Sequence, residues 1–227
     1  MKKFLVVLLV VILFGGSIYT LGWSKVLPVK KIQIYGTAHT DVVEQILQSG
    51  TARIYVGQPI ARVNIHALRS KLNLVPWIGN SLVRRDWLNG IIEVDVTERI
   101  PVAQFSPRSG QLMFFDDTGV EFIPIGITPK LPVINFTTSD IEARRSVAIL
   151  VQQLPADLLA AMRGMTVSSP RSLLMSCTFN THNFSIEWGA ATEMASKVKV
   201  LRALLRLPEN TSATLFNLAT VASPVVK

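Results

Sequence analysis

The first half of the chain alternates between strand-like and helix-like patterns of apolar residues. Residues 31–36, KIQIYG, alternate apolar and polar side chains as a half-buried strand does. Apolar side chains then recur at helical spacing over residues 40–49 and 65–75. The strand-like alternation returns over residues 78–86 and 91–99. The order strand, helix, helix, strand, strand predicts a small α+β domain.

Polar residues mark the expected ends of these elements. Thr40 and Asn64 are of the types that cap helix N-termini, because their side chains accept backbone N–H groups. Gly50 and Pro76 stand where the two helices are expected to stop. Between the last two strands, residues 89–90 are Asn-Gly, a strong short hairpin signal.

Two registers of this hairpin fit the pattern. A turn centred on residues 89–90 pairs Val83 with Val96, and the alternative pairs Val83 with Val94. Both registers place Ile92, Val94 and Val96 on one sheet face, which we expect to face the core.

The charged residues of the hairpin fall into two groups. Arg84 lies opposite a carboxylate in both registers, which is expected on the solvent face of a half-buried sheet. Arg85, in contrast, falls on the apolar face of the sheet in both registers. Glu98 and Arg99 stand just before Pro101, where the pattern changes and charges are expected to be paired or functional.

Beyond Pro101, short strand-like segments alternate with turns and helices. Ser139 and Glu142 form a capping-box pattern that opens a helix. A final helix follows Gly189 and carries lysines and arginines mostly on the side opposite its apolar residues. We expect strands at 102–106, 111–117, 119–125, 172–179, 183–189 and 213–221. The helix from 141 has its apolar positions at Ile141, Val147, Leu150, Val151 and Leu154, and the final helix has them at Met194, Val198, Leu201 and Leu205, opposite Lys197, Lys199, Arg202 and Arg206.

The start of the chain predicts a membrane span. Phe4 to Leu21 is an uncharged run of 18 residues, and a helix of that length is roughly 27 Å long, close to the thickness of a bilayer's hydrocarbon core. The alternative is a cleaved signal peptide, whose apolar region is normally about 7–15 residues long. Trp23 favours an uncleaved anchor, because tryptophan prefers the membrane interface. Lysines lie on both sides of the run, so charge alone leaves the orientation open, and the short N-terminal tail favours a cytoplasmic N-terminus.

Composition narrows the possible functions. Of 227 residues, 49% are hydrophobic, which is too apolar for a disordered chain. The single cysteine, Cys177, excludes an intramolecular disulfide and a cysteine metal cluster. The net charge is +8, and without Lys2 and Lys3 it is +6. Such a charge suits anionic lipids or wall polymers, and the alternative is an ordinary solvated basic surface without a specific ligand. No clustered basic and aromatic motif supports nucleic-acid binding.

Catalytic motifs are missing from the sequence. His39, His66 and His182 lack metal-binding spacing. The chain has no Gly-x-Ser-x-Gly elbow and no phosphate-binding glycine loop. Residues 116–117 are Asp-Asp in a turn pattern, and Cys177 stands in an apolar strand pattern. We therefore expect a protein that is not an enzyme, with no cofactor, metal or small-molecule substrate.

Residues 83–103 resemble the signature of the FtsQ/DivIB family of bacterial cell-division proteins. That signature is an arginine before Trp-Pro, an alternating strand, and Glu-Arg-x-Pro-Val-Ala. Leu88 departs from it, since the family usually has proline there. Residues 32–40, 57–64, 114–122, 131–134, 186–205 and 215–226 resemble other family segments in the same order, with Asn217 near a usual aspartate. The matching signature residues are Val83, Arg84 or Arg85, Trp87, Ile92, Val94, Val96, Glu98, Arg99, Pro101, Val102 and Ala103.

The resemblance implies a domain order. It implies a POTRA domain, of β-α-α-β-β order, and then a mixed, mainly antiparallel β domain with flanking helices. The expected divisions are a cytoplasmic tail at 1–3, a transmembrane signal anchor at 4–23, the POTRA domain at 27–99, the β domain at 100–222 and a C-terminal tail at 223–227.

The resemblance also implies a function. The chain would be a non-enzymatic, single-pass type II protein of the plasma membrane at the division septum, with a cytoplasmic N-terminus. It would bridge early and late division proteins by binding FtsL- and FtsB/DivIC-like partners outside the membrane, with no role for nucleic acid. The alternative is a membrane-anchored transport or secretion component with a POTRA domain, although such proteins usually carry tandem POTRA units or a membrane barrel.

An exposed sheet edge is the expected means of partner binding. The candidate edge is the uncharged segment from Thr214 to Ala222, which could also be an ordinary terminal strand. Its candidate contact residues are Thr214, Leu215, Phe216, Asn217, Leu218, Ala219, Thr220 and Val221. Candidates for further contacts, at the POTRA domain and the domain junction, are Arg84, Arg85, Trp87, Glu98 and Arg99.

Overall fold

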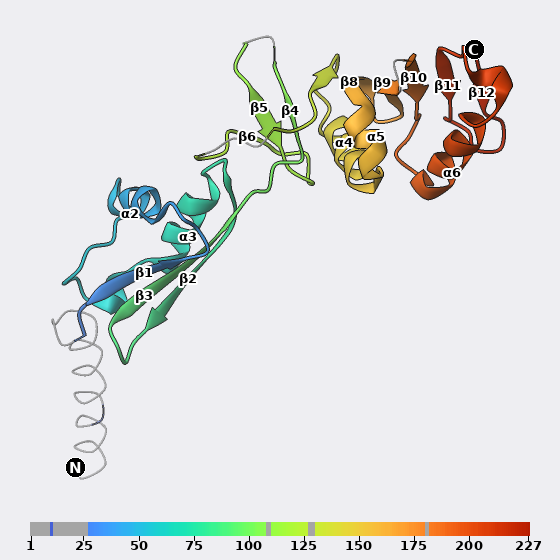
Figure 1. Ribbon diagram of the computed structural model, residues 1–227. Coiled ribbons are helices and arrows are strands. Elements are labelled where there is room, and N and C mark those ends of the chain that lie inside the picture. Colours follow the sequence, from blue (N-terminus) through green and yellow to red (C-terminus); the bar gives the residue numbers. More distant parts are fainter. Residues whose placement is uncertain (1–9, 11–26, 108–109, 127–129, 180–181) are drawn as a thin grey trace. The chain divides into compact units, whose positions relative to one another are not determined.

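The structure is a computed structural model that describes residues 10, 27–107, 110–126, 130–179 and 182–227 (Figure 1). The chain divides into two compact units, residues 1–99 and residues 100–227. The predicted span at 4–23 lies, except for Val10, outside the described residues. No helix in the described part of the chain is long and apolar enough to cross a membrane.

The first unit has the predicted order of elements. Its three-stranded sheet has the order β1-β3-β2, with β1 parallel and β2 antiparallel to β3. The two helices bury Val43, Leu47, Leu68 and Leu72 in the core of this unit. The elements are β1 (Lys31–Tyr35), α2 (Thr40–Gln48), the 3-10 turn η1 (Ile60–Arg62), α3 (Ile65–Asn73), β2 (Ile78–Asp86) and β3 (Ile91–Glu98).

The β2–β3 hairpin adopts one of the two expected registers. Val83 pairs with Val94 and Asp86 with Ile91, so the loop has four residues, 87–90. The other register, with a turn centred on residues 89–90, is therefore wrong. The Asp86 carboxylate stabilises the longer loop, because it accepts the backbone N–H groups of Leu88 and Asn89 at 3.1 Å. The predicted core face is confirmed, since all three of its β3 residues are buried, namely Ile92, Val94 and Val96.

The two helix starts in this unit differ from each other. Asn64 caps α3 as predicted, with its side chain accepting the N–H of Ala67 at 3.0 Å. Thr40 is instead the first residue of α2, and His39 stands at the cap position without a capping side-chain bond. The Thr37 hydroxyl accepts the His39 N–H at 3.0 Å, so the polar partner lies outside the helix.

The second unit contains two sheets. A three-stranded antiparallel sheet has the order β4-β5-β6, and a six-stranded mixed sheet has the order β12-β11-β10-β9-β8-β7. Within the larger sheet β7 is parallel to β8 and β10 to β11, whereas the other pairs are antiparallel. The elements are β4 (Ala103–Phe105), β5 (Met113–Phe115), β6 (Glu121–Phe122), β7 (Ile134–Phe136), α4 (Ile141–Gln153), α5 (Ala156–Ala161), β8 (Met162–Ser169), β9 (Ser172–Phe179), β10 (His182–Glu187), α6 (Met194–Leu204), the 3-10 turn η2 (Pro208–Asn210), β11 (Leu215–Asn217) and β12 (Val225–Val226).

Helices cover one face of the six-stranded sheet. Buried residues of α4 and α6, such as Val147 and Leu201, belong to the same apolar core as Met165, Met175 and Ile186 of the strands. Strand β9 alternates buried and exposed residues along its length, so its other face meets solvent.

Three predictions for this unit need correction. Asp140 rather than Ser139 caps α4, and its carboxylate accepts the N–H of Glu142 at 2.9 Å. Ile141 is exposed, because it begins the helix on its solvent side. Strand β8 and helix α5 were not predicted, and Gly164 interrupts the apolar alternation within β8.

Candidate functional site

The candidate edge segment lies next to the end of the six-stranded sheet. Only Leu215–Asn217 of the segment forms a strand, β11, which pairs with β10 on one side and with β12 on the other. The prediction that this segment is the sheet edge is therefore wrong. Residues 225–226 return alongside it and form the edge themselves. A role of the segment in partner binding stays a prediction.

Strand β12 leaves backbone groups at the sheet edge. Leu215 and Lys227 exchange two hydrogen bonds, each 3.0 Å from nitrogen to oxygen. In an antiparallel pair, the backbone groups of successive residues point to opposite sides. The N–H and C=O of Val226 are consequently directed away from β11. No described strand lies beyond β12 in this sheet.

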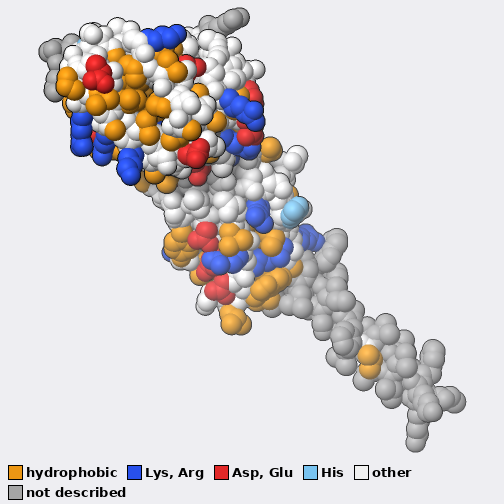
Figure 2. Space-filling view, turned by 90° about the vertical axis from the view of Figure 1, so that its right-hand side faces the viewer, with side chains coloured by type: hydrophobic (Ala, Val, Ile, Leu, Met, Phe, Trp, Pro, Cys, Tyr) orange, Lys and Arg blue, Asp and Glu red, His pale blue; other side chains and the backbone are white. Residues whose placement is uncertain are grey.

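The surface around this edge is uncharged. No residue from Asn210 to Val226 is charged, and the side chain of Val225 is 47% exposed. Figure 2, which faces this end of the second unit, shows hydrophobic side chains gathered there, with charged groups mainly at the margin. Proteins commonly protect free edges with lysine, proline or a covering loop. Only Pro224, just before β12, and Lys227, just after it, are of these protecting types.

Asn217 connects β11 to β10 through its side chain. Its amide Nδ2 donates to Glu187 Oε2 at 2.7 Å, and its Oδ1 accepts the N–H of Ala219 at 3.0 Å. Leu218 continues this attachment, because its N–H donates to the Glu187 carbonyl at 2.8 Å. These bonds fix the position at which the chain leaves β11.

A buried lysine supports the segment that follows β10. Lys197 is 1% exposed, and its Nζ donates to the carbonyls of Trp188 at 2.6 Å and Ala190 at 2.7 Å. Burial lowers the pKa of Lys197, and Glu193 opposes that shift. Lys197 is therefore an exception to the predicted placement of the basic residues opposite the apolar side of the helix, because these carbonyls bind its ammonium group inside the unit. Gly189 stands between these two residues and lies close to the segment that follows β11. A Cβ at position 189 would be 2.8 Å from Ala219.

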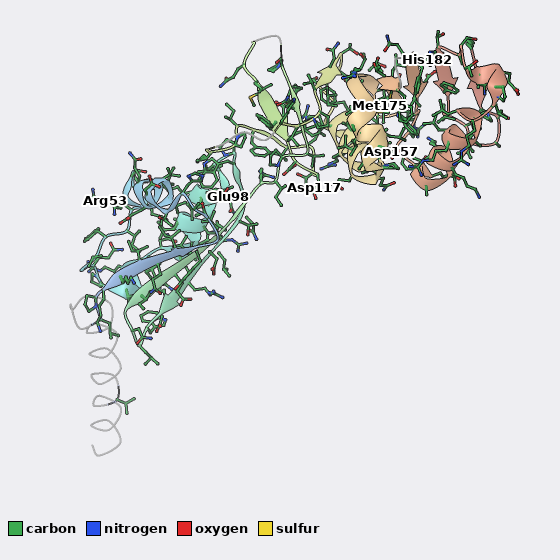
Figure 3. All side chains as sticks on the ribbon, viewed as in Figure 1. Arg53, Glu98, Asp117, Asp157, Met175 and His182 are labelled. Atoms are coloured by element: carbon green, nitrogen blue, oxygen red, sulfur yellow. The ribbon has the colours of Figure 1, made fainter. Side chains whose placement is uncertain are left out.

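A hollow of about 600 Å³ lies beside this end of the sheet, lined in part by Asp157, His182 and Arg202. Arg202 pairs with the Asp157 carboxylate at 3.0 Å, which connects α6 to α5. His182 Nε2 lies 2.8 Å from the Ala213 carbonyl and so holds the start of β11 (Figure 3). These three side chains of the hollow thus bind one another or the backbone.

The candidate residues of the first unit are mostly bound within it. Arg84 pairs with Asp95 at 2.7 Å and with Glu93 at 3.5 Å on the solvent face. Arg85 reaches the other face, where its Nη2 donates to the Val63 carbonyl. The guanidinium of Arg85 also lies 5.6 Å from the centre of the Trp87 ring, a cation–π contact.

Glu98 and Arg99 lie at the far end of the hairpin from that pair. Glu98 accepts a hydrogen bond from the Thr37 hydroxyl (Figure 3), and Arg99 Nε donates to the Pro76 carbonyl at 2.9 Å. Both side chains are thus hydrogen-bonded to neutral groups of the first unit, and a functional role for them stays a prediction. The structure does not bring the five candidates together, because Arg84, Arg85 and Trp87 lie near one end of the hairpin.

The described residues offer little for metal or thiol chemistry. They contain no group of three or more His, Cys, Asp or Glu side chains that could hold a metal ion. Cys177 is buried, and this burial raises the pKa of its thiol to about 11. The reactive thiolate is therefore scarce at neutral pH.

Two comparisons with known proteins relate this chain to FtsQ proteins. Residues 27–99 match the family model described as "POTRA domain, FtsQ-type". The chain is also 30% identical, over 137 residues, to the cell division protein FtsQ of Allochromatium vinosum. The match covers 59% of this chain and 52% of that relative, so the chain spans about half of the relative's length.

Proposed function

We propose, on the premise that the chain belongs to the FtsQ/DivIB family, that it is a single-pass membrane protein of the bacterial division machinery. The FtsQ-type POTRA match at 27–99 and the similarity to an FtsQ protein support this role. The uncharged run from Phe4 to Leu21 supports an anchor at 4–23. In this proposal the N-terminus is cytoplasmic, and both units act outside the membrane at the septum.

The protein acts by binding rather than by catalysis. Its partners are FtsL- and FtsB/DivIC-like proteins, which it holds together during septum formation. The buried state of Cys177 and the internally bonded charges of the first unit support a scaffold, since neither provides an exposed reactive group.

Strand addition at β12 is the proposed binding mode. An extended partner segment would pair with the outward N–H and C=O of Val226 and lengthen the six-stranded sheet. The observation that carries this proposal is the two-residue edge strand in an uncharged surface. Thr214–Val221 would then mainly support the binding strand, because β11 pairs with β12. Its exposed residues Ala219 and Thr220 flank the edge.

A proline at position 226 tests the binding mode. Proline removes the outward N–H of Val226, and an edge strand tolerates it where that N–H faces solvent. We would titrate the full-length protein, in detergent or nanodiscs, with the extracytoplasmic segments of its FtsL- and FtsB-like partners. Val226→Pro is expected to lower the affinity for the FtsB-like partner at least tenfold. Leu174→Ser is the control, because Leu174 is exposed on β9, which is paired on both sides.

The two variants separate the possible results. Weakened binding by Val226→Pro, with wild-type affinity for Leu174→Ser, supports strand addition at β12. Equal affinity of folded wild type and Val226→Pro would refute that binding mode. Absence of binding by the folded wild type would refute the proposed partners.

A further inference from the structure

Two loops of the first unit flank the segment through which the chain enters it. The side loop, residues 55–58, bonds to Val29, because Val29 and the loop exchange hydrogen bonds of 2.8 Å through Gln58 and Gly57. The tip loop, residues 87–90, bonds to the next residue, since the Lys30 N–H donates to the Gly90 carbonyl at 2.7 Å. Both loops therefore lie at the same end of the unit.

The tip loop packs closely on this entering segment. Gly90 has a φ of +71°, and a Cβ at that position would be 2.8 Å from the Pro28 carbonyl oxygen. The hairpin tip is therefore held against residues 28–30 and cannot swing away from them without losing this packing.

These loops expose large apolar side chains. Leu88 is 92% exposed and Trp87 43% in the tip loop, while Val56 is 61% and Tyr55 54% exposed in the side loop. Single exposed apolar residues are common on protein surfaces. Four of them on two loops at the same end of the unit are a concentration that indicates a contact surface.

The charges at this end are mainly basic. Lys30 and Lys31 are exposed beside the loops, and Arg62 is exposed on the 3-10 turn whose first residue bonds to Leu27. The one acidic residue within 27–31, 53–62 and 84–91 is Asp86. Its carboxylate already accepts the N–H groups of the tip loop. A basic surface of this kind complements anionic lipid headgroups.

The chain length keeps this end near the proposed anchor. Five residues separate Leu21, the last of the apolar run, from Leu27, and the six steps between their Cα atoms span at most about 20 Å even when fully extended. The eight residues of β3 extend roughly 26 Å. The entering end of the unit is therefore within reach of the bilayer, whereas the opposite end is farther from it.

We infer that the tip loop and side loop rest in the interfacial layer of the membrane beside the anchor. Trp87 and Tyr55 lie at the level of the headgroups, Leu88 and Val56 insert among the upper acyl chains, and Lys30 and Lys31 contact anionic headgroups. The contact would limit how the first unit can tilt on its tether. The inference rests on the proposed membrane anchor.

Nitroxide labels at single cysteines test the inference. Leu88→Cys and Val56→Cys label the two loops of the full-length protein, reconstituted in phosphatidylethanolamine–phosphatidylglycerol vesicles. Leu74→Cys is the matched control, because Leu74 is 82% exposed and precedes β2 at the end opposite the tip loop. Unsubstituted protein gives the background from Cys177, which is buried. Electron paramagnetic resonance compares collisions of each label with oxygen and with a water-soluble nickel chelate.

The outcomes distinguish the inference from the anchor proposal. For each label, the ratio of collisions with oxygen to collisions with the chelate is measured. Ratios at 88 and 56 that are at least three times the ratio at 74 support the inference. Equal, water-like ratios at all three sites, in protein that resists alkaline extraction from the vesicles, overturn it and leave the anchor standing. Release of the protein by alkaline extraction overturns the anchor proposal and the inference with it.

Discussion

The side-chain amide of Asn217 donates a 2.7 Å hydrogen bond to the Glu187 carboxylate across the β10–β11 pair. The two residues are direct cross-strand neighbours. An aspartate, which the FtsQ/DivIB family usually has near position 217, would place two carboxylates in contact here. The asparagine therefore fits the glutamate that this chain has at position 187, and the pair stabilises the strand next to the proposed binding edge.

Asn217→Asp is expected to destabilise the second unit by about 1 kcal/mol at pH 7, because it replaces a hydrogen bond by repulsion between like charges. Thermal unfolding followed by circular dichroism measures the change. The double variant Asn217→Asp with Glu187→Gln is expected to recover most of the loss, since a glutamine can donate to the new carboxylate. A single variant as stable as wild type would show that the pair contributes nothing.

Lys197→Met is expected to lower the free energy of unfolding by about 2–3 kcal/mol, because it leaves the buried carbonyls of Trp188 and Ala190 without their charged donor. Lys199→Met is the control, since Lys199 is exposed on the same helix. Urea unfolding compares the two variants. Similar unfolding midpoints for both would contradict the supporting role of Lys197.

Asp86 is expected to make the first unit sensitive to acid. The side-chain amide of Asn89 and then its backbone N–H hold the pKa of Asp86 below its usual value. Because the folded-state pKa is depressed, the stabilisation is fully present above the unfolded-state value of about 3.9 and is lost as pH falls through the folded-state pKa. Wild type is thus expected to be more stable than Asp86→Asn at pH 7. That difference should shrink steadily below about pH 4. Unfolding midpoints measured from pH 7 to pH 2 check this, and a constant difference would refute it.

Val94→Asp is expected to unfold the first unit, because Val94 is fully buried on the core face of β3 and an unpaired buried charge costs at least several kcal/mol. Thr97→Asp, on the solvent face of the same strand, is expected to fold normally. Limited proteolysis with mass spectrometry reports which unit is cleaved. Protection of the first unit in Val94→Asp would mean that the face assignment is wrong.

The elements of the first unit could be predicted because each has a clear local pattern. Alternation in β1, β2 and β3 and the Asn64 cap depend on neighbours in sequence. The hairpin register could not be predicted. It depends on the Asp86 side chain, whose bonds to the tip loop outweigh the Asn-Gly turn preference.

The edge of the second unit could be predicted only approximately. The segment containing β11 has a strand-like pattern, but β12 is two residues long and has no period to detect. Its pairing depends on contacts with Leu215 and Asn217 that only the folded chain brings together. The burial of Lys197 was missed for a similar reason, because its carbonyl partners lie seven and nine residues earlier, outside its own helix.

The most direct test of strand addition is amide hydrogen exchange of the full-length protein with and without the FtsB-like partner. The Val226 amide is the reporter, because its N–H is directed away from β11 and lacks a strand partner within the described chain. Strand addition predicts that this amide exchanges rapidly in the free protein and at least tenfold more slowly in the complex. Unchanged exchange at Val226 in a saturated complex, with protection appearing elsewhere, would contradict the proposed binding edge.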